Sequence, residues 1–118
     1  MPYLIIAFAV VLLIAGVYHF VNPAFYRPFM PEGIPKELAN ATGGLFEIVI
    51  GIGLLIPQWR GYALWAACGL MIVFLPLHVI DLFRKKPAIG PHWVAAMRLV
   101  VQLVLIWWLW WEATNWVK

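Results

Sequence analysis

The sequence predicts an all-α membrane protein: an antiparallel four-helix transmembrane bundle with a Pro/aromatic-rich interfacial loop between its first two helices. Of 118 residues, 65% are apolar and only 11% are charged, whereas soluble domains average about half apolar and about a quarter charged. The apolar residues fall into four stretches close to the roughly 17 to 25 residues that a helix needs to cross a bilayer. Most of the charged residues lie in the joins between these stretches.

Four spans of similar length are predicted within a single domain over residues 1–118, at residues 3–21, 39–56, 61–80 and 93–111. The join between the second and third spans, "PQWR", is short enough to make these two spans a tight antiparallel pair. No basic region precedes the first apolar stretch and no clear small-residue cleavage site follows it. This pattern favours a retained span over a removed signal peptide.

Lys and Arg residues are unevenly divided between the two ends of the predicted bundle. The first and third joins contain Arg27, Lys36, Arg84, Lys85 and Lys86, and the other end contains Arg60 and Lys118. The excess of positive charge predicts that the first and third joins face the cytoplasm and that both termini lie outside. The net charge of +3 is therefore interpreted as orientation and contact with anionic lipid, with no nucleic-acid partner.

Five polar residues are expected at one end of the bundle, where they form a candidate ligand-binding cluster: His19, Glu47, His78, Arg98 and Gln102. At a rise of about 1.5 Å per residue, Glu47 lies about 12 Å and Arg98 about 8 Å from the same membrane face. A lone charge at the bilayer centre costs about 2.5 to 3.5 kcal/mol, so opposite charges in one bundle should pair. We therefore expect an ion pair between Glu47 and Arg98.

Other interpretations of the same residues remain open. The charged pair could be a structural clamp between helices, and the histidines could bond lipid headgroups or loop carbonyls. A metal site that includes Asp81 is a further option, but the sequence has no H-x-x-E-H, E-x-x-H or C-x-x-C spacing and Arg98 would repel a cation. No metal is expected. The one cysteine, Cys68, allows neither an intramolecular disulfide nor a redox pair.

The stretch "YHFVNPAFYRPFMPEGIPKE", residues 18–37, combines four prolines with five aromatic residues. Its prolines cannot continue a helix, and its rings favour the headgroup layer. It also connects the first histidine of the cluster to the span that carries the glutamate. We expect an ordered cap over the polar cluster with four residues at its rim, namely Phe20, Pro23, Phe25 and Arg27. The alternative is an interfacial loop that covers nothing.

Four segments together resemble the DoxX-like family of small bacterial membrane proteins: "GVYHFVNPAFYRPFMPEGIP", "GGLFEIVIGIGLLIPQWR", "FLPLHVIDLF" and "MRLVVQLVLIWWLWW". The resemblance covers nearly the whole chain. It implies a four-helix bundle in the bacterial cytoplasmic (inner) membrane, with His19, Glu47, Arg98 and Gln102 at the family's polar motif positions. Some members are linked to membrane redox systems, including a quinone-reducing thiosulfate oxidoreductase and detoxification complexes.

Three functions follow as hypotheses. In the first, the chain is an accessory or binding subunit of a redox assembly, which holds a quinone-like or other small amphipathic ligand while a partner protein supplies electrons. In the second, it is a non-enzymatic scaffold or partner-recruiting subunit, whose polar cluster only locks the helices and whose loops recruit a partner protein. A homo-oligomer is possible under either hypothesis. The third is a small proton-coupled transporter, although small multidrug exporters carry their glutamate in the first span, whereas this chain carries it in the second.

Overall fold

The computed structural model describes residues 2–30 and 33–116, and all regular structure in this part of the chain is helical. The elements follow one another as α1 (Tyr3–Val21), α2 (Pro23–Tyr26), the 3₁₀ turn η1 (Arg27–Phe29), α3 (Lys36–Leu55), α4 (Arg60–Leu82) and α5 (His92–Thr114). Four of these helices are long and apolar enough to cross a membrane. The predicted fold class is therefore confirmed, whereas Pro31, Glu32 and Lys118 lie outside the described residues.

The long helices extend past the predicted spans at several ends. Helix α3 begins at Lys36 and not at residue 39, and α5 continues to Thr114, three residues past the predicted end. The hydropathy pattern locates the apolar part of a helix, whereas the helix itself continues until its backbone hydrogen bonds end. Polar residues such as Lys36 are accepted there because helix ends reach the headgroup layer.

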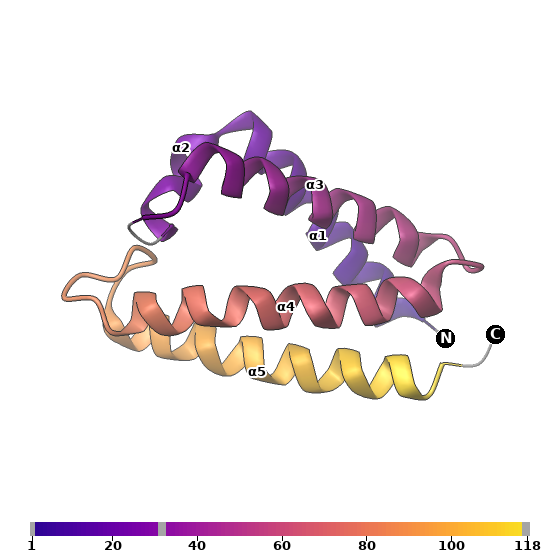
Figure 1. The fold of residues 1–118 in the computed structure, drawn as a ribbon. Helices are drawn as coiled ribbons and strands as arrows, with labels where there is room; N and C mark the ends of the chain where they lie inside the picture. The colour runs from indigo at the N-terminus through magenta and orange to yellow at the C-terminus, as the bar shows by residue number, and fades with distance from the viewer. Residues whose placement is uncertain (1, 31–32, 117–118) are drawn as a thin grey trace.

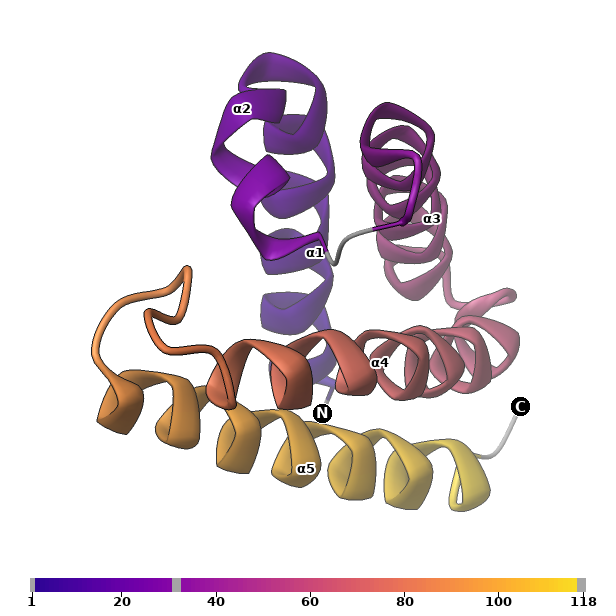
Figure 2. The ribbon, with the colours of Figure 1, turned by 60° about the vertical axis from the view of Figure 1, so that its left-hand side comes forward.

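The four long helices form two closely packed pairs, α1 with α3 and α4 with α5. Figures 1 and 2 show that the pairs lie close together at the end where both termini are found and diverge toward the opposite end. Between α1 and α3 the first turns of the connection, Asn22 to Met30, fold back over the bundle as α2 and η1. We call these residues the cap segment.

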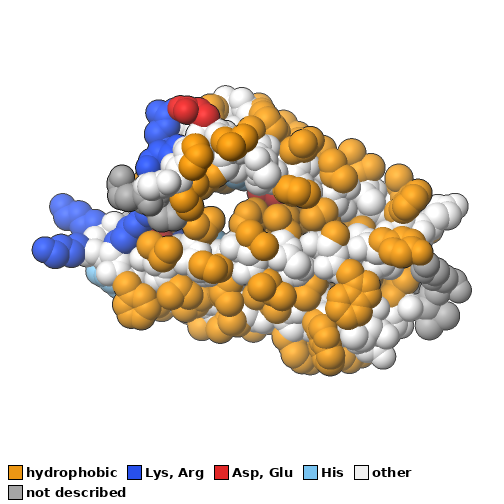
Figure 3. Space-filling model, in the orientation of Figure 1, with side chains coloured by type: hydrophobic (Ala, Val, Ile, Leu, Met, Phe, Trp, Pro, Cys, Tyr) orange, Lys and Arg blue, Asp and Glu red, His pale blue; other side chains and the backbone are white. Residues whose placement is uncertain are grey.

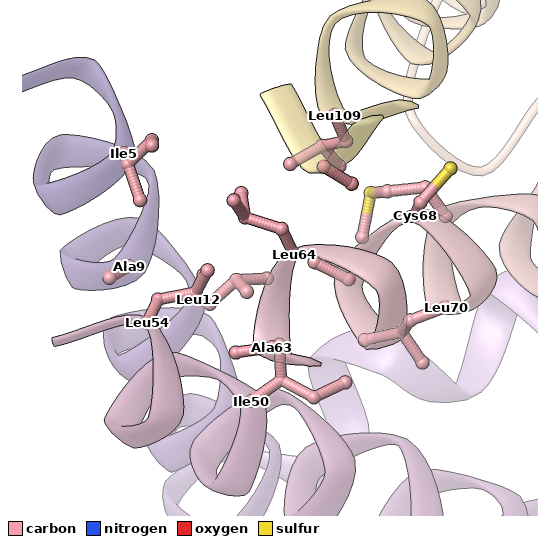
Figure 4. Close-up of a cluster of buried hydrophobic side chains, with 13 residues drawn as sticks. Ile5, Ala9, Leu12, Ile50, Leu54, Ala63, Leu64, Cys68, Leu70 and Leu109 are labelled. Atoms are coloured by element: carbon pink, nitrogen blue, oxygen red, sulfur yellow. The ribbon is translucent and has the colours of Figure 1, made fainter. Parts of the chain in front are cut away.

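The apolar core occupies the end of the bundle where the pairs converge. Side chains of all four long helices meet there, including Leu12 of α1, Leu54 of α3, Leu64 of α4 and Leu109 of α5 (Figure 4). The core thins toward the cap segment because the pairs diverge. The opposite end of the bundle therefore has room for polar side chains and a cavity.

Glycines set the close approach of α1 and α3. A Cβ atom added at Gly44 would lie 2.7 Å from the Cβ of His19, and one added at Gly16 would lie 2.9 Å from the Gly44 carbonyl oxygen. Small residues at such contacts let two helix backbones pack directly against each other in a membrane. This packing brings His19 of α1 against α3, close to the glutamate that α3 carries.

Arg60 fixes the tight turn between α3 and α4. It is buried, and its Nε donates a hydrogen bond to the carbonyl oxygen of Leu54 at 2.6 Å. Its guanidinium also lies over the ring of Trp116, 5.5 Å from the ring centroid. The positive charge satisfies the C-terminal carbonyls of α3, where the helix dipole is negative.

Candidate functional site

A cavity of about 550 Å³ lies at the diverging end of the bundle, beneath the cap segment. Most of its wall is apolar, from residues such as Phe8, Leu12, Phe74 and Leu105. The structure brings all five residues of the predicted polar cluster to this wall: His19, Glu47, His78, Arg98 and Gln102. Figure 3 shows acidic and histidine side chains inside a hollow between apolar surfaces.

The expected ion pair between Glu47 and Arg98 is not formed. Glu47 instead contacts His19, whose Nε2 lies 2.8 Å from Glu47 Oε1, and both side chains are buried. Arg98 instead contacts Asp81, with 2.9 Å between Nη2 and Oδ2. The prediction was wrong because each charge has a nearer partner: the glycine contacts of α1 and α3 join His19 to Glu47, and the pairing of α4 with α5 joins Asp81 to Arg98.

Asn40 determines where the proton of His19 lies. The Asn40 amide donates from Nδ2 to the His19 carbonyl oxygen at 2.8 Å, so its Oδ1 faces His19 Nδ1 at 2.6 Å. A carboxamide oxygen only accepts hydrogen bonds, which means that Nδ1 carries a hydrogen and donates it. The hydrogen bond between His19 Nε2 and Glu47 Oε1 therefore needs one further proton, held either by the imidazole or by the carboxyl group. Both forms of the pair have zero net charge.

Asp81 is the centre of a second polar group at the same end. Its side chain is fully buried and accepts hydrogen bonds from Arg84 Nη1 at 3.2 Å and from Arg98 Nη2 at 2.9 Å. The backbone N–H of Ala88 also donates to it, at 2.6 Å, as does that of Ile89, at 3.4 Å. Since two guanidinium groups share one carboxylate, one positive charge is in excess here.

His78 and Gln102 complete the polar wall between α4 and α5. Gln102 donates from Nε2 to the carbonyl oxygen of Met71 at 2.8 Å, which fixes its side chain across the two helices. Two buried nitrogens have no hydrogen-bond partner among the described residues, namely His78 Nδ1 and Arg98 Nε. A buried polar group without a partner costs about 1 to 3 kcal/mol, so these atoms favour a bound polar group.

The cap segment closes the cavity with its rings. Phe25, Tyr26 and Phe29 all line the cavity. The ring of Tyr26 stacks on His19 with centroids 3.6 Å apart, and its hydroxyl donates to the Ala15 carbonyl oxygen at 3.1 Å. Burial raises the pKa of the Tyr26 hydroxyl above its ordinary value, which keeps this donor protonated.

Two arginines hold the cap segment from the α4–α5 side. Arg84 donates to the carbonyl oxygens of Pro28, at 2.5 Å, and of Met30, at 3.3 Å. The guanidinium of Arg98 lies over the Phe29 ring, 5.2 Å from its centroid. The same two arginines bind Asp81, so this one carboxylate positions the residues that hold the cap.

Of the four residues predicted at the rim, the structure places only Phe25 on the cavity wall. Phe20 is exposed and packs near Gly44, Pro23 begins α2, and Arg27 forms an exposed contact with Glu37 at 3.5 Å. The expected rim is therefore corrected to Phe25, Tyr26, Pro28, Phe29 and Met30. The error arises because η1 turns the later part of the segment, and not its start, toward the cavity.

Asn40 and Asp81 are the two polar residues of the candidate site that the sequence prediction left out of the cluster. Asn40 precedes Glu47 by seven residues and Asp81 follows His78 by three, spacings that place both residues on the same helix face as their neighbour. That periodicity could have added them to the cluster. Within residues 2–30 and 33–116, no group of three or more His, Cys, Asp or Glu side chains is arranged to hold a metal ion.

The fold and the site together define a multi-pass membrane protein with a capped, partly polar cavity at one end of a helix bundle. The chain belongs to the family described as a domain of unknown function, DUF8561, which matches residues 8–113. No curated protein and no solved structure matches it. The resemblance to the DoxX-like family stays a prediction.

Proposed function

We propose that this protein is a membrane subunit that binds a small amphipathic molecule carrying carbonyl or hydroxyl oxygens, such as a quinone, in the capped cavity. The observation that carries the proposal is the combination of apolar walls with two buried nitrogens, on His78 and Arg98, that have no hydrogen-bond partner in the described part of the chain. Small-molecule sites in proteins have this character, with volumes of about 300 to 1,000 Å³ and a few convergent polar groups. The cavity, at about 550 Å³, lies within that range.

The charges around the cavity favour an electron-rich oxygen. The excess positive charge of Arg84 and Arg98 over Asp81 would attract a carbonyl oxygen or an oxyanion. On the opposite wall, the His19–Glu47 pair holds one proton between two atoms 2.8 Å apart. A ligand that gains or loses protons as it is reduced or oxidised would thus lie between the positively charged arginine side of the cavity and the His19–Glu47 pair, which holds a proton. A partner protein would supply the electrons, as in the redox assemblies that the DoxX-like resemblance implies.

A scaffold without a ligand is the second candidate, and one observation favours it. Each buried carboxylate of the site already has protein partners, His19 for Glu47 and the two arginines for Asp81. Such internally paired groups can serve to fix one packing of the helices. The scaffold hypothesis assigns no role to the unpartnered nitrogen of His78, which makes that residue the best place to separate the two candidates.

The test uses His78→Leu with Gln58→Leu as its control. The first change removes a polar group that makes no hydrogen bond through Nδ1, and the second changes an exposed residue of the α3–α4 turn. Each protein is reconstituted in lipid nanodiscs, and binding of a tailless benzoquinone is measured by quenching of tryptophan fluorescence. Thermal unfolding of the same samples reports the fold.

The proposal expects His78→Leu to keep the fold of the wild type, because removal of a buried Nδ1 without a partner among the described residues offsets the lost interaction with Gln102. It also expects this variant to bind the benzoquinone about tenfold more weakly, the loss of one hydrogen bond of about 1.4 kcal/mol. Gln58→Leu should bind like the wild type. Equal binding by His78→Leu and wild type, or no saturable binding by the wild type, would favour the scaffold.

A further inference from the structure

A second and larger cavity, of about 890 Å³, lies beside the capped one, between α3 and α4. Its wall is almost entirely apolar and comes from Leu38, Phe46 and Val49 of α3 and from Leu70, Val73 and Ile80 of α4. We call it the tail groove. Many of these side chains are exposed and belong to the membrane-spanning helices. The tail groove is therefore open toward the hydrocarbon of the bilayer and not toward water.

The two cavities meet at four residues that line both, namely His19, Met30, Phe74 and Leu77. Gly43 lies at this junction: a Cβ added there would be 3.8 Å from His19 Cε1 and 3.8 Å from Phe74 Cζ. Those are ordinary van der Waals distances, so the backbone of α3 leaves only a small free space at this point. The capped cavity and the tail groove thus share one boundary beside His19.

We infer that the tail groove holds the apolar tail of the ligand whose oxygen-bearing head lies in the capped cavity. This inference rests on the proposed function and narrows its ligand class to single-tailed amphipathic lipids, of which prenyl and alkyl quinones are examples. Such a molecule moves within the bilayer and reaches the capped cavity sideways, between α3 and α4. The cap segment then separates its head from water, while the tail stays in contact with lipid.

An ordinary phospholipid fits this geometry less well. Its acyl chain ends in a methyl group, which offers nothing to the unpartnered nitrogens of His78 and Arg98 at the inner end of the path. A partner helix lying against α3 and α4 would cover the apolar surface of the tail groove, but it would not account for the connection between the groove and the capped cavity.

The experiment compares two probes and two variants. The probes are a benzoquinone without a tail and the same ring with a decyl tail, each expressed as a mole fraction of the nanodisc lipid so that partition into the bilayer cancels. Ala66→Phe fills the tail groove from α4, because Ala66 lines that cavity and does not line the capped one. Gly69→Phe adds a ring to the same helix and serves as the control, because a Cβ added at Gly69 meets no other part of the described chain within 4 Å, apart from its neighbours in α4.

In the wild type and in Gly69→Phe, the tailed probe should bind about tenfold more tightly than the tailless one, because its chain gains packing contacts in the groove. In Ala66→Phe the two probes should bind with about the same affinity, because the tailed probe loses its advantage while binding of the tailless probe is unchanged. If the tailed probe still binds Ala66→Phe more tightly than the tailless probe does, the inference is overturned and the proposed function is left intact. This result is expected if a phospholipid or a partner helix occupies the tail groove. Failure of both probes on the wild type overturns the proposed function itself, and the inference with it.

Discussion

The two buried carboxylates should differ in how much stability is lost when each is replaced by the matching amide. Glu47 shares one proton with His19, so Glu47→Gln replaces one neutral arrangement by another: the new amide N–H donates to His19 Nε2, and Asn40 still accepts from Nδ1. Asp81 has no proton to share, because all four groups around it donate hydrogen bonds. Asp81→Asn turns amide hydrogens toward those donors and removes the charge that two guanidinium groups face.

The magnitudes follow from burial and from the partners. Breaking a buried ion pair by removing one partner costs about 3 to 5 kcal/mol, because the other charge is left uncompensated. The side chains of Arg84 and Arg98 remain 26% and 19% exposed, which allows some hydration and places the loss for Asp81→Asn near 3 kcal/mol, the lower end of that range. For Glu47→Gln a hydrogen bond is kept, and the expected loss is about 1 kcal/mol or less.

The assay is reversible unfolding in mixed micelles, followed by the fluorescence of the tryptophans, with the wild type and both variants at one protein concentration. Asp81→Asn should lower the free energy of unfolding by about three times as much as Glu47→Gln or more. Equal losses for the two variants, or a larger loss for Glu47→Gln, would show that Glu47 carries an uncompensated charge and would refute the shared proton. An infrared band of a protonated carboxyl group that disappears in Glu47→Gln would identify the neutral form of the pair.

Three further predictions follow from the packing, the cap segment and the charge pattern. Gly44→Ala should lower the free energy of unfolding by about 1 to 3 kcal/mol, because the added methyl group lies 2.7 Å from the Cβ of His19 on α1. Gly43→Ala is its control: its contacts are 3.8 Å long, and it should change the free energy of unfolding by less than about 0.5 kcal/mol. Arg84→Gln should raise hydrogen exchange in the cap segment and leave the termini end of α1 unchanged, since two of the bonds that hold the segment are lost; unchanged exchange would mean that the rings alone hold it. A cysteine at Lys85 in an otherwise cysteine-free chain should react with an impermeant maleimide only from the cytoplasmic side, and labelling of intact cells would reverse the predicted orientation.

The sequence by itself determined the fold class and predicted five of the polar residues that line the cavity. Four long apolar stretches leave a helix as the only way to satisfy backbone groups in lipid, apart from a closed barrel that their length excludes. Alternating span directions then bring polar residues far apart in the chain, such as His19 and Arg98, to a similar depth. Depth along a helix depends on residue number alone, which is why sequence position predicted which polar residues gather at one end.

Partner choice was decided by the tertiary structure. Glu47 and Arg98 line one cavity, yet Glu47 pairs with His19 and Arg98 pairs with Asp81. Which charges meet depends on which helices touch, and that depends on close contacts such as the one at Gly44, where an added Cβ would lie 2.7 Å from the Cβ of His19 on α1. The turn of the cap segment that brings Tyr26 and Phe29 over the cavity is likewise a matter of three-dimensional packing. Hydropathy and charge are summed along a chain and can be read from it, whereas pairing is a competition between neighbours in space, and those neighbours are known only once the helices are packed.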